Sequence, residues 1–135
     1  LPGTGKDTWI RENHPELPMI SLDAIREELK ILPTENQGPV IEAARERAKV
    51  LLRKKQPFVW NATDLSPSIR QKQVGMFAKY GARVRIVYLE TDWEEMLRRN
   101  RSRGAVVPEQ AICHMMRHLT PPETWEAHHV EWICV

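Results

Sequence analysis

The chain has 135 residues, of which 41% are hydrophobic and 28% are charged, and its net charge is +2. This length suits one globular domain with a hydrophobic core, and so small an excess of positive charge does not by itself indicate nucleic-acid binding. The two cysteines, Cys113 and Cys134, lie in a sequence without a secretory or membrane-spanning stretch, which favours a cytoplasmic protein without a disulfide and without a membrane partner.

Hydrophobic periodicity and helix breakers predict helices that alternate with short apolar strands. Helices are expected over residues 6–14, 23–32, 40–55, 66–81, 93–102 and 108–119. Strands are expected over residues 17–21, 58–61, 83–89 and 132–135. This alternation is typical of an α/β protein, and we predict a P-loop NTPase-like three-layer fold, with a parallel sheet flanked by helices and a helical lid that carries arginines.

The first eight residues, which we call the glycine-rich loop, read Leu-Pro-Gly-Thr-Gly-Lys-Asp-Thr. They correspond to a phosphate-binding loop of the G-x-x-x-x-G-K-[ST] type without its first glycine. Gly3 and Gly5 would allow the backbone to approach phosphates, and Lys6 would reach the β- and γ-phosphates. The predicted ligands of ATP or another NTP are Gly3, Thr4, Gly5, Lys6, Asp7 and Thr8. A glycine-rich turn with a helix cap at Asp7 is the structural alternative.

Asp7 stands where such loops normally carry Ser or Thr, and Thr8 follows it. A carboxylate binds Mg²⁺ well but repels a phosphate when the metal is absent. We therefore predict that Asp7 is a metal ligand and that nucleotide binding depends strongly on Mg²⁺. Because the loop starts without its strand, residues 1–135 are interpreted as a P-loop kinase domain that lacks its first strand, with a further domain expected upstream of Leu1.

The candidate functional residues lie where an expected strand ends and a helix begins, which is the edge where ligands bind in open parallel sheets. Asp23 could accept the proton of an attacking hydroxyl, and Arg26, one turn later, could hold a phosphate of the acceptor. Alternatively, Asp23 only caps a helix and Arg26 is solvated.

The next strand end carries Asn61, Thr63 and Asp64, and Arg70 follows them. The short side chains could orient substrate or a metal-bound water, and Arg70 could contact a phosphate. A capping turn before the next helix is an equally natural interpretation.

Four arginines lie within residues 98–103. Arg99 and Arg103, four positions apart, would share a helix face and could stabilise the charge of the transferred phosphoryl group. A solvated basic helix face is the alternative. With Lys6 and Asp23, these two arginines are the predicted catalytic residues.

Together these motifs resemble the 5′-hydroxyl polynucleotide kinases, a P-loop family of nucleic-acid repair, over nearly the whole chain. The lid string Arg-Asn-Arg-Ser-Arg-Gly with Val107-Pro108 is the most specific match, and the Asn-Ala-Thr-Asp-Leu-Ser-Pro segment is similar to the family's acceptor motif. The resemblance implies that Asp23 activates the 5′-OH, that Arg26 binds the acceptor's phosphate, and that Arg99 and Arg103 hold the donor phosphates. The Gly-Lys-Asp string resembles kinase modules that follow an HD-type phosphohydrolase in bacterial two-domain proteins.

We therefore predict transfer of the γ-phosphate of ATP, or of another NTP, to the 5′-OH end of DNA or RNA, with Mg²⁺ as the cofactor. Two alternatives stay open. One is a kinase for a small molecule such as a sugar, nucleoside or antibiotic. The other is a nucleotide-binding switch without transfer activity.

Overall fold

The computed structural model describes residues 1–135, which divide into two compact units. Unit 1 comprises Leu1–Trp9 and Thr63–Val135, and unit 2 comprises Ile10–Ala62. Helix α1 (Lys6–Asn13) contributes residues to both units. None of the helices combines the length with the apolar character that crossing a membrane requires.

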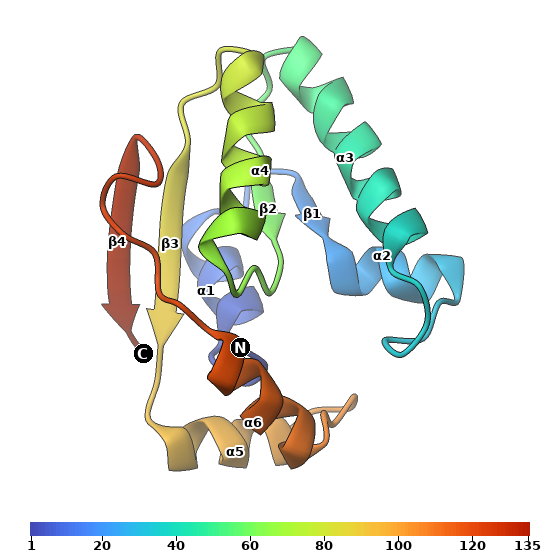
Figure 1. The fold of residues 1–135 in the computed structure, drawn as a ribbon, viewed down its shortest axis with the longest axis vertical. Helices are drawn as coiled ribbons and strands as arrows, with labels where there is room; N and C mark the ends of the chain where they lie inside the picture. The colour runs from blue at the N-terminus through green and yellow to red at the C-terminus, as the bar shows by residue number, and fades with distance from the viewer. The chain divides into compact units, whose positions relative to one another are not determined.

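Unit 1 contains a pair of strands that run parallel, β3 and β4 (Figure 1). Its elements are α4 (Pro67–Lys79), β3 (Arg85–Glu90), α5 (Trp93–Ser102), α6 (Glu109–His118) and β4 (His129–Cys134). The strand register pairs Arg85 with His129 and Glu90 with Cys134. Because a parallel pair needs a long crossover, the two helices α5 and α6 lie between these strands in the sequence.

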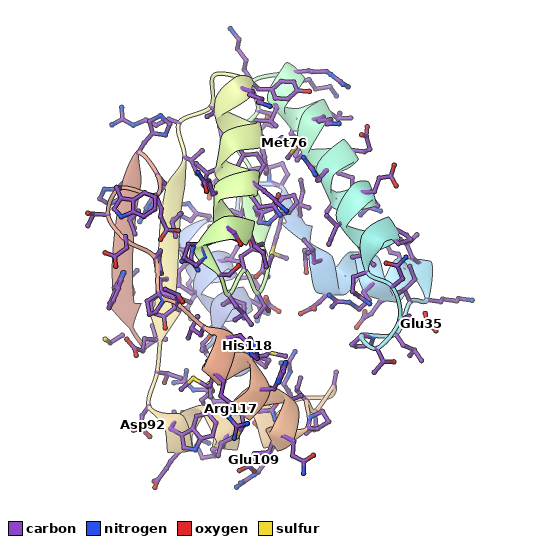
Figure 2. The ribbon with its side chains drawn as sticks, viewed as in Figure 1. Glu35, Met76, Asp92, Glu109, Arg117 and His118 are labelled. Atoms are coloured by element: carbon purple, nitrogen blue, oxygen red, sulfur yellow. The ribbon has the colours of Figure 1, made fainter.

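In unit 1, helices α4 and α5 begin at residues whose side chains accept hydrogen bonds from the first backbone N–H groups of the helix. The Ser66 hydroxyl accepts a hydrogen bond from the Ile69 backbone N–H at 3.4 Å, and Pro67 occupies the first turn, where its missing N–H costs little. The Asp92 carboxylate accepts from the Glu94 and Glu95 backbone N–H groups at the start of α5, where Figure 2 labels it. Helices α5 and α6 pack through Met96, Leu97 and Ile112, which form a buried cluster.

Unit 2 contains the second parallel pair, in which Met19, Ile20 and Ser21 lie opposite Val59, Trp60 and Asn61. Its elements are β1 (Met19–Ser21), α2 (Leu22–Leu29), α3 (Gly38–Arg53) and β2 (Val59–Asn61). Helix α3 has a buried stripe at helical spacing, formed by Val40, Ala44, Ala48 and Leu52.

The predicted α/β class with parallel strands is confirmed, and every predicted helix and strand is present. The helix predicted over residues 93–102 has both ends as expected, and the other elements differ at one or both ends. Helix α2 ends at Leu29 rather than at residue 32, because Lys30 adopts a left-handed conformation with φ 55° and its N–H donates to the Glu27 carbonyl. Helix α3 begins two residues earlier than predicted, since Pro39 is tolerated in a first helical turn.

Candidate functional site

The glycine-rich loop of unit 1 uses both of its glycines in the left-handed region. Gly3 has φ +82° and Gly5 has φ +87°. The loop is closed by hydrogen bonds to the Leu1 carbonyl, which accepts from the Thr4 hydroxyl at 2.8 Å and from Lys6 Nζ at 2.9 Å. Helix α1 begins at Lys6, so the loop leads into a helix N-terminus, where backbone N–H groups favour anions.

Gly3 also allows the loop to pack closely against α5. A Cβ at Gly3 would lie 2.5 Å from the Met96 carbonyl oxygen and 3.4 Å from the Asn100 backbone nitrogen. Real Cβ atoms almost never approach an oxygen so closely, so only glycine fits here. The glycine-rich loop is therefore packed directly on α5, the helix that carries Arg98, Arg99 and Arg101.

Asp7 and Thr8 are exposed in the first turn of α1. Their carboxylate and hydroxyl oxygens are the hard donors that Mg²⁺ takes in proteins. The chemistry of these two donors is compatible with magnesium, and the role of Asp7 as a direct metal ligand stays a prediction.

The arginines of α5 separate into different environments. Arg98 and Arg101 are 72% and 69% exposed, and they form ion pairs with Glu95 and with Glu109 respectively. Arg99 lies against the loop, because a Cβ at Gly5 would be 3.5 Å from its Nη1 atom. The structure thus brings Arg99 together with the glycine-rich loop.

Glu95 connects two of these arginines and was not singled out by the sequence patterns. Its Oε1 atom accepts from Arg99 Nε at 2.7 Å, and both of its oxygens accept from Arg98. The hydrogen bonds from Arg98 and from Arg99 lower the pKa of Glu95 to about 2. The carboxylate is therefore ionised at neutral pH.

The expectation that Arg99 and Arg103 share a helix face is wrong. Helix α5 ends at Ser102, and Arg103 has extended backbone with φ −84° and ψ 154°, so a helical turn does not relate the two arginines. The lid is instead shaped by Asn100, a buried residue whose amide donates to the Val107 carbonyl at 2.7 Å and accepts from the Val107 N–H at 3.1 Å. These two bonds close the segment that contains Arg103.

In unit 2 the structure brings Asp23 and Arg26 together at the start of α2. Arg26 Nη1 lies 2.5 Å from Asp23 Oδ1, and Arg26 Nε donates to Gln37 Oε1 at 2.6 Å. Gln37 in turn donates to the Leu32 and Glu35 carbonyls of the loop before α3, where Figure 2 labels Glu35. Arg26 is 22% exposed and Asp23 is 74% exposed, so the arginine is held in place while the carboxylate remains accessible. The helix itself is capped by the Ser21 hydroxyl, which accepts from the Ala24 N–H, rather than by Asp23.

The residues that follow β2 differ in exposure. Asn61 is buried at the end of the strand, and its amide donates to Met19 Sδ at 3.8 Å. Thr63 is exposed and Asp64 is half-buried. Their contact with a substrate or with a metal-bound water stays a prediction.

Arg70 occupies a buried structural position. Its Nε and Nη2 atoms donate to the two oxygens of Glu126 at 2.7 and 3.2 Å, and its Nη1 atom donates to the Asp64 carbonyl at 3.0 Å. The two side chains are only 7% and 3% exposed. Burial by itself would raise the pKa of Glu126, but hydrogen bonds from Arg70 and from the Glu123 N–H outweigh it and lower that pKa. Arg70 therefore holds the segment around Asp64, and its predicted contact with substrate has no support in this geometry.

The structure combines parallel strands, a glycine-rich loop that leads into a helix at Lys6, and an arginine against that loop, an arrangement typical of P-loop proteins. The comparisons with known proteins agree. The model of the AAA domain family designated AAA_33 matches residues 1–122, and the chain belongs to this family.

Among solved structures, the chain is similar to an unliganded sugar kinase from Janibacter sp. HTCC2649. The two superpose with a TM-score of 0.70 at 15% sequence identity, over 99% of this chain and 80% of the kinase. At this identity the likeness concerns the fold, which is the P-loop kinase-like α/β fold predicted from the sequence.

Proposed function

We propose that the protein transfers the γ-phosphate of ATP, or of another NTP, to the 5′-OH end of a polynucleotide. Lys6 and the backbone N–H groups of the glycine-rich loop would hold the donor phosphates, with Arg99 and Arg103 contributing further positive charge. Asp23 would serve as the general base, and Arg26 would bind a phosphate of the acceptor. Catalysis of this kind depends on positioning and on charge stabilisation more than on covalent chemistry.

The observation that supports a polynucleotide acceptor is the pairing of Asp23 with Arg26. It places a guanidinium 2.5 Å from the carboxylate that would receive the hydroxyl proton. The 5′-OH of a nucleic-acid strand has a phosphodiester one sugar away, so its acceptor site needs a cation close to the base. A neutral sugar has no such group for the arginine to bind.

In the transfer step, the 5′-hydroxyl oxygen forms a bond to the γ-phosphorus. The bond from that phosphorus to the β,γ-bridging oxygen breaks, and the nucleoside diphosphate leaves with the electron pair. The hydroxyl proton passes to the Asp23 carboxylate. Mg²⁺, when bound, would neutralise phosphate charge, and Asp7 and Thr8 are the residues of the loop that would help to hold it.

A small-molecule acceptor is the second candidate, and the similarity to a sugar kinase favours it. Sugar kinases and polynucleotide kinases would differ here mainly in what Arg26 contacts. If the acceptor is a sugar without a phosphate, Arg26 only positions Asp23, and its replacement should leave the KM of the acceptor nearly unchanged.

The test is transfer of radiolabelled γ-phosphate to a 5′-OH oligonucleotide and, in parallel, to a panel of sugars and nucleosides. We expect labelling of the oligonucleotide, its loss in Asp23→Asn, and a raised KM for the oligonucleotide in Arg26→Gln. Glu27→Gln is the matched control, because Glu27 is an exposed carboxylate of the same helix. Labelling of a sugar alone would establish the second candidate, and ATP binding without transfer to any acceptor would indicate a nucleotide-binding switch.

A further inference from the structure

We propose that Glu95 is a positioning residue that holds the Arg99 guanidinium at the glycine-rich loop, so that its terminal nitrogens face the donor phosphates. This inference rests on the proposed function, in which Arg99 contacts those phosphates. It assigns a role to a carboxylate that would otherwise be an unfavourable neighbour of a phosphate site.

The geometry around Arg99 carries the inference. One edge of the guanidinium is bound, because Nε donates to Glu95 Oε1 at 2.7 Å. The Nη1 atom lies at the loop, 3.5 Å from the position of a Cβ on Gly5. A guanidinium recognises phosphate through two parallel N–H groups, and binding of the Nε edge leaves the Nη1 and Nη2 groups for that purpose.

Glu95 is itself held in one orientation. Arg98 donates to it through two atoms, from Nε to Oε2 and from Nη2 to Oε1, both at 2.7 Å. Its place in the first turn of α5 also suits a negative charge, since helix N-termini are electropositive. A carboxylate fixed in this way can orient Arg99 before the nucleotide arrives, which reduces the entropy lost on binding.

Two other roles for Glu95 make different predictions. If Glu95 only stabilises α5, its loss lowers stability but changes nucleotide affinity little. If Glu95 competes with phosphate for Arg99, its loss tightens nucleotide binding. Only a positioning role weakens binding in a way that depends on Arg99.

The experiment is a calorimetric titration of the purified protein with ATP and Mg²⁺, with no acceptor present. We expect Glu95→Gln to raise the Kd about tenfold, the scale of one well-oriented charged hydrogen bond. Arg99→Gln should raise it at least as much, and the double variant should be no weaker than Arg99→Gln alone. The control Glu94→Gln removes the same charge from the neighbouring exposed position of α5, and its Kd should stay within about twofold of wild type.

A Kd of Glu95→Gln equal to or lower than that of wild type would overturn the inference. So would a Kd that Glu95→Gln raises by the same factor in the Arg99→Gln protein as in wild type. Thermal unfolding of each variant shows whether a weakened Kd reflects lost structure, and Arg99→Lys provides a second folded background in which the Nε contact is absent. Because the titration contains no acceptor, failure to phosphorylate oligonucleotides would refute the proposed function and leave this result intact.

Discussion

Replacement of Gly3 by alanine tests whether the glycine-rich loop packs on α5 as described. Alanine at φ +82° costs about 1–2 kcal/mol in backbone strain. Its Cβ would also meet the Met96 carbonyl oxygen at 2.5 Å, and relief of such a contact in a packed region costs about 1–3 kcal/mol. We therefore expect Gly3→Ala to lower the free energy of unfolding by about 2–5 kcal/mol.

Two other glycines separate these contributions. Gly5 has a similar φ of +87° but its Cβ would make only an ordinary contact, so Gly5→Ala should cost about 1–2 kcal/mol. Gly75 lies within α4 and its Cβ would meet open space, so Gly75→Ala should stabilise the protein by about 1 kcal/mol through helix propensity.

Urea unfolding, followed by circular dichroism and extrapolated to water, measures all three variants. The expected order of stability is Gly75→Ala, wild type, Gly5→Ala and then Gly3→Ala. Equal losses for Gly3→Ala and Gly5→Ala would refute the close approach to α5, because backbone strain alone would then account for both.

Three further predictions concern acid stability, the lid and the metal. The pKa of Glu126 in the folded protein lies below its ordinary value of 4.5, so the stability that its charge provides is complete above pH 4.5 and is lost as the pH falls through the folded pKa. Glu126→Gln should lower the free energy of unfolding by about 3–5 kcal/mol at pH 7 and should make urea unfolding less dependent on acid pH. An unchanged dependence on pH would argue against the ion pair of Glu126 with Arg70. Asn100→Ala removes both hydrogen bonds to Val107, so we expect the free energy of unfolding to fall by about 1–3 kcal/mol and limited proteolysis within residues 101–106 to become faster. Unchanged cleavage would contradict the role of Asn100 in holding this segment. Asp7→Ser should bind ATP with a smaller difference between Mg²⁺ and EDTA than wild type does, and an equal difference in the two proteins would remove Asp7 from the metal site.

The order of helices and strands could be predicted because it depends on local patterns. A short apolar run predicts the strand that it forms, and the Ser66-Pro67 pair predicts the helix that begins there, so each signal lies within a few residues of its element. The ends were less accurate where a residue departed from its usual conformation, as Lys30 does in adopting a positive φ.

The site could be predicted only in part, because local patterns do not show contacts between residues that are far apart in the sequence. The spacing of Asp23 and Arg26 indicated two side chains one turn apart on a helix, but their ion pair was not predicted. The i, i+4 relation of Glu95 to Arg99 is a local signal from which that second ion pair could have been predicted. Arg70 and Glu126 lie 56 residues apart, and no local pattern connects them. Burial of that pair changes the expected role of Arg70 from a phosphate ligand to a structural residue.

The proposed function depends on binding of a nucleotide's phosphates by Lys6 in the glycine-rich loop. Its most direct test is a calorimetric titration of wild type and Lys6→Met with ATP and Mg²⁺, using Lys79→Met, an exposed lysine of α4, as the control. We predict saturable binding by wild type and by the control, and a loss of affinity of at least about tenfold in Lys6→Met. Equal binding by all three proteins, or no binding by wild type, would contradict the account.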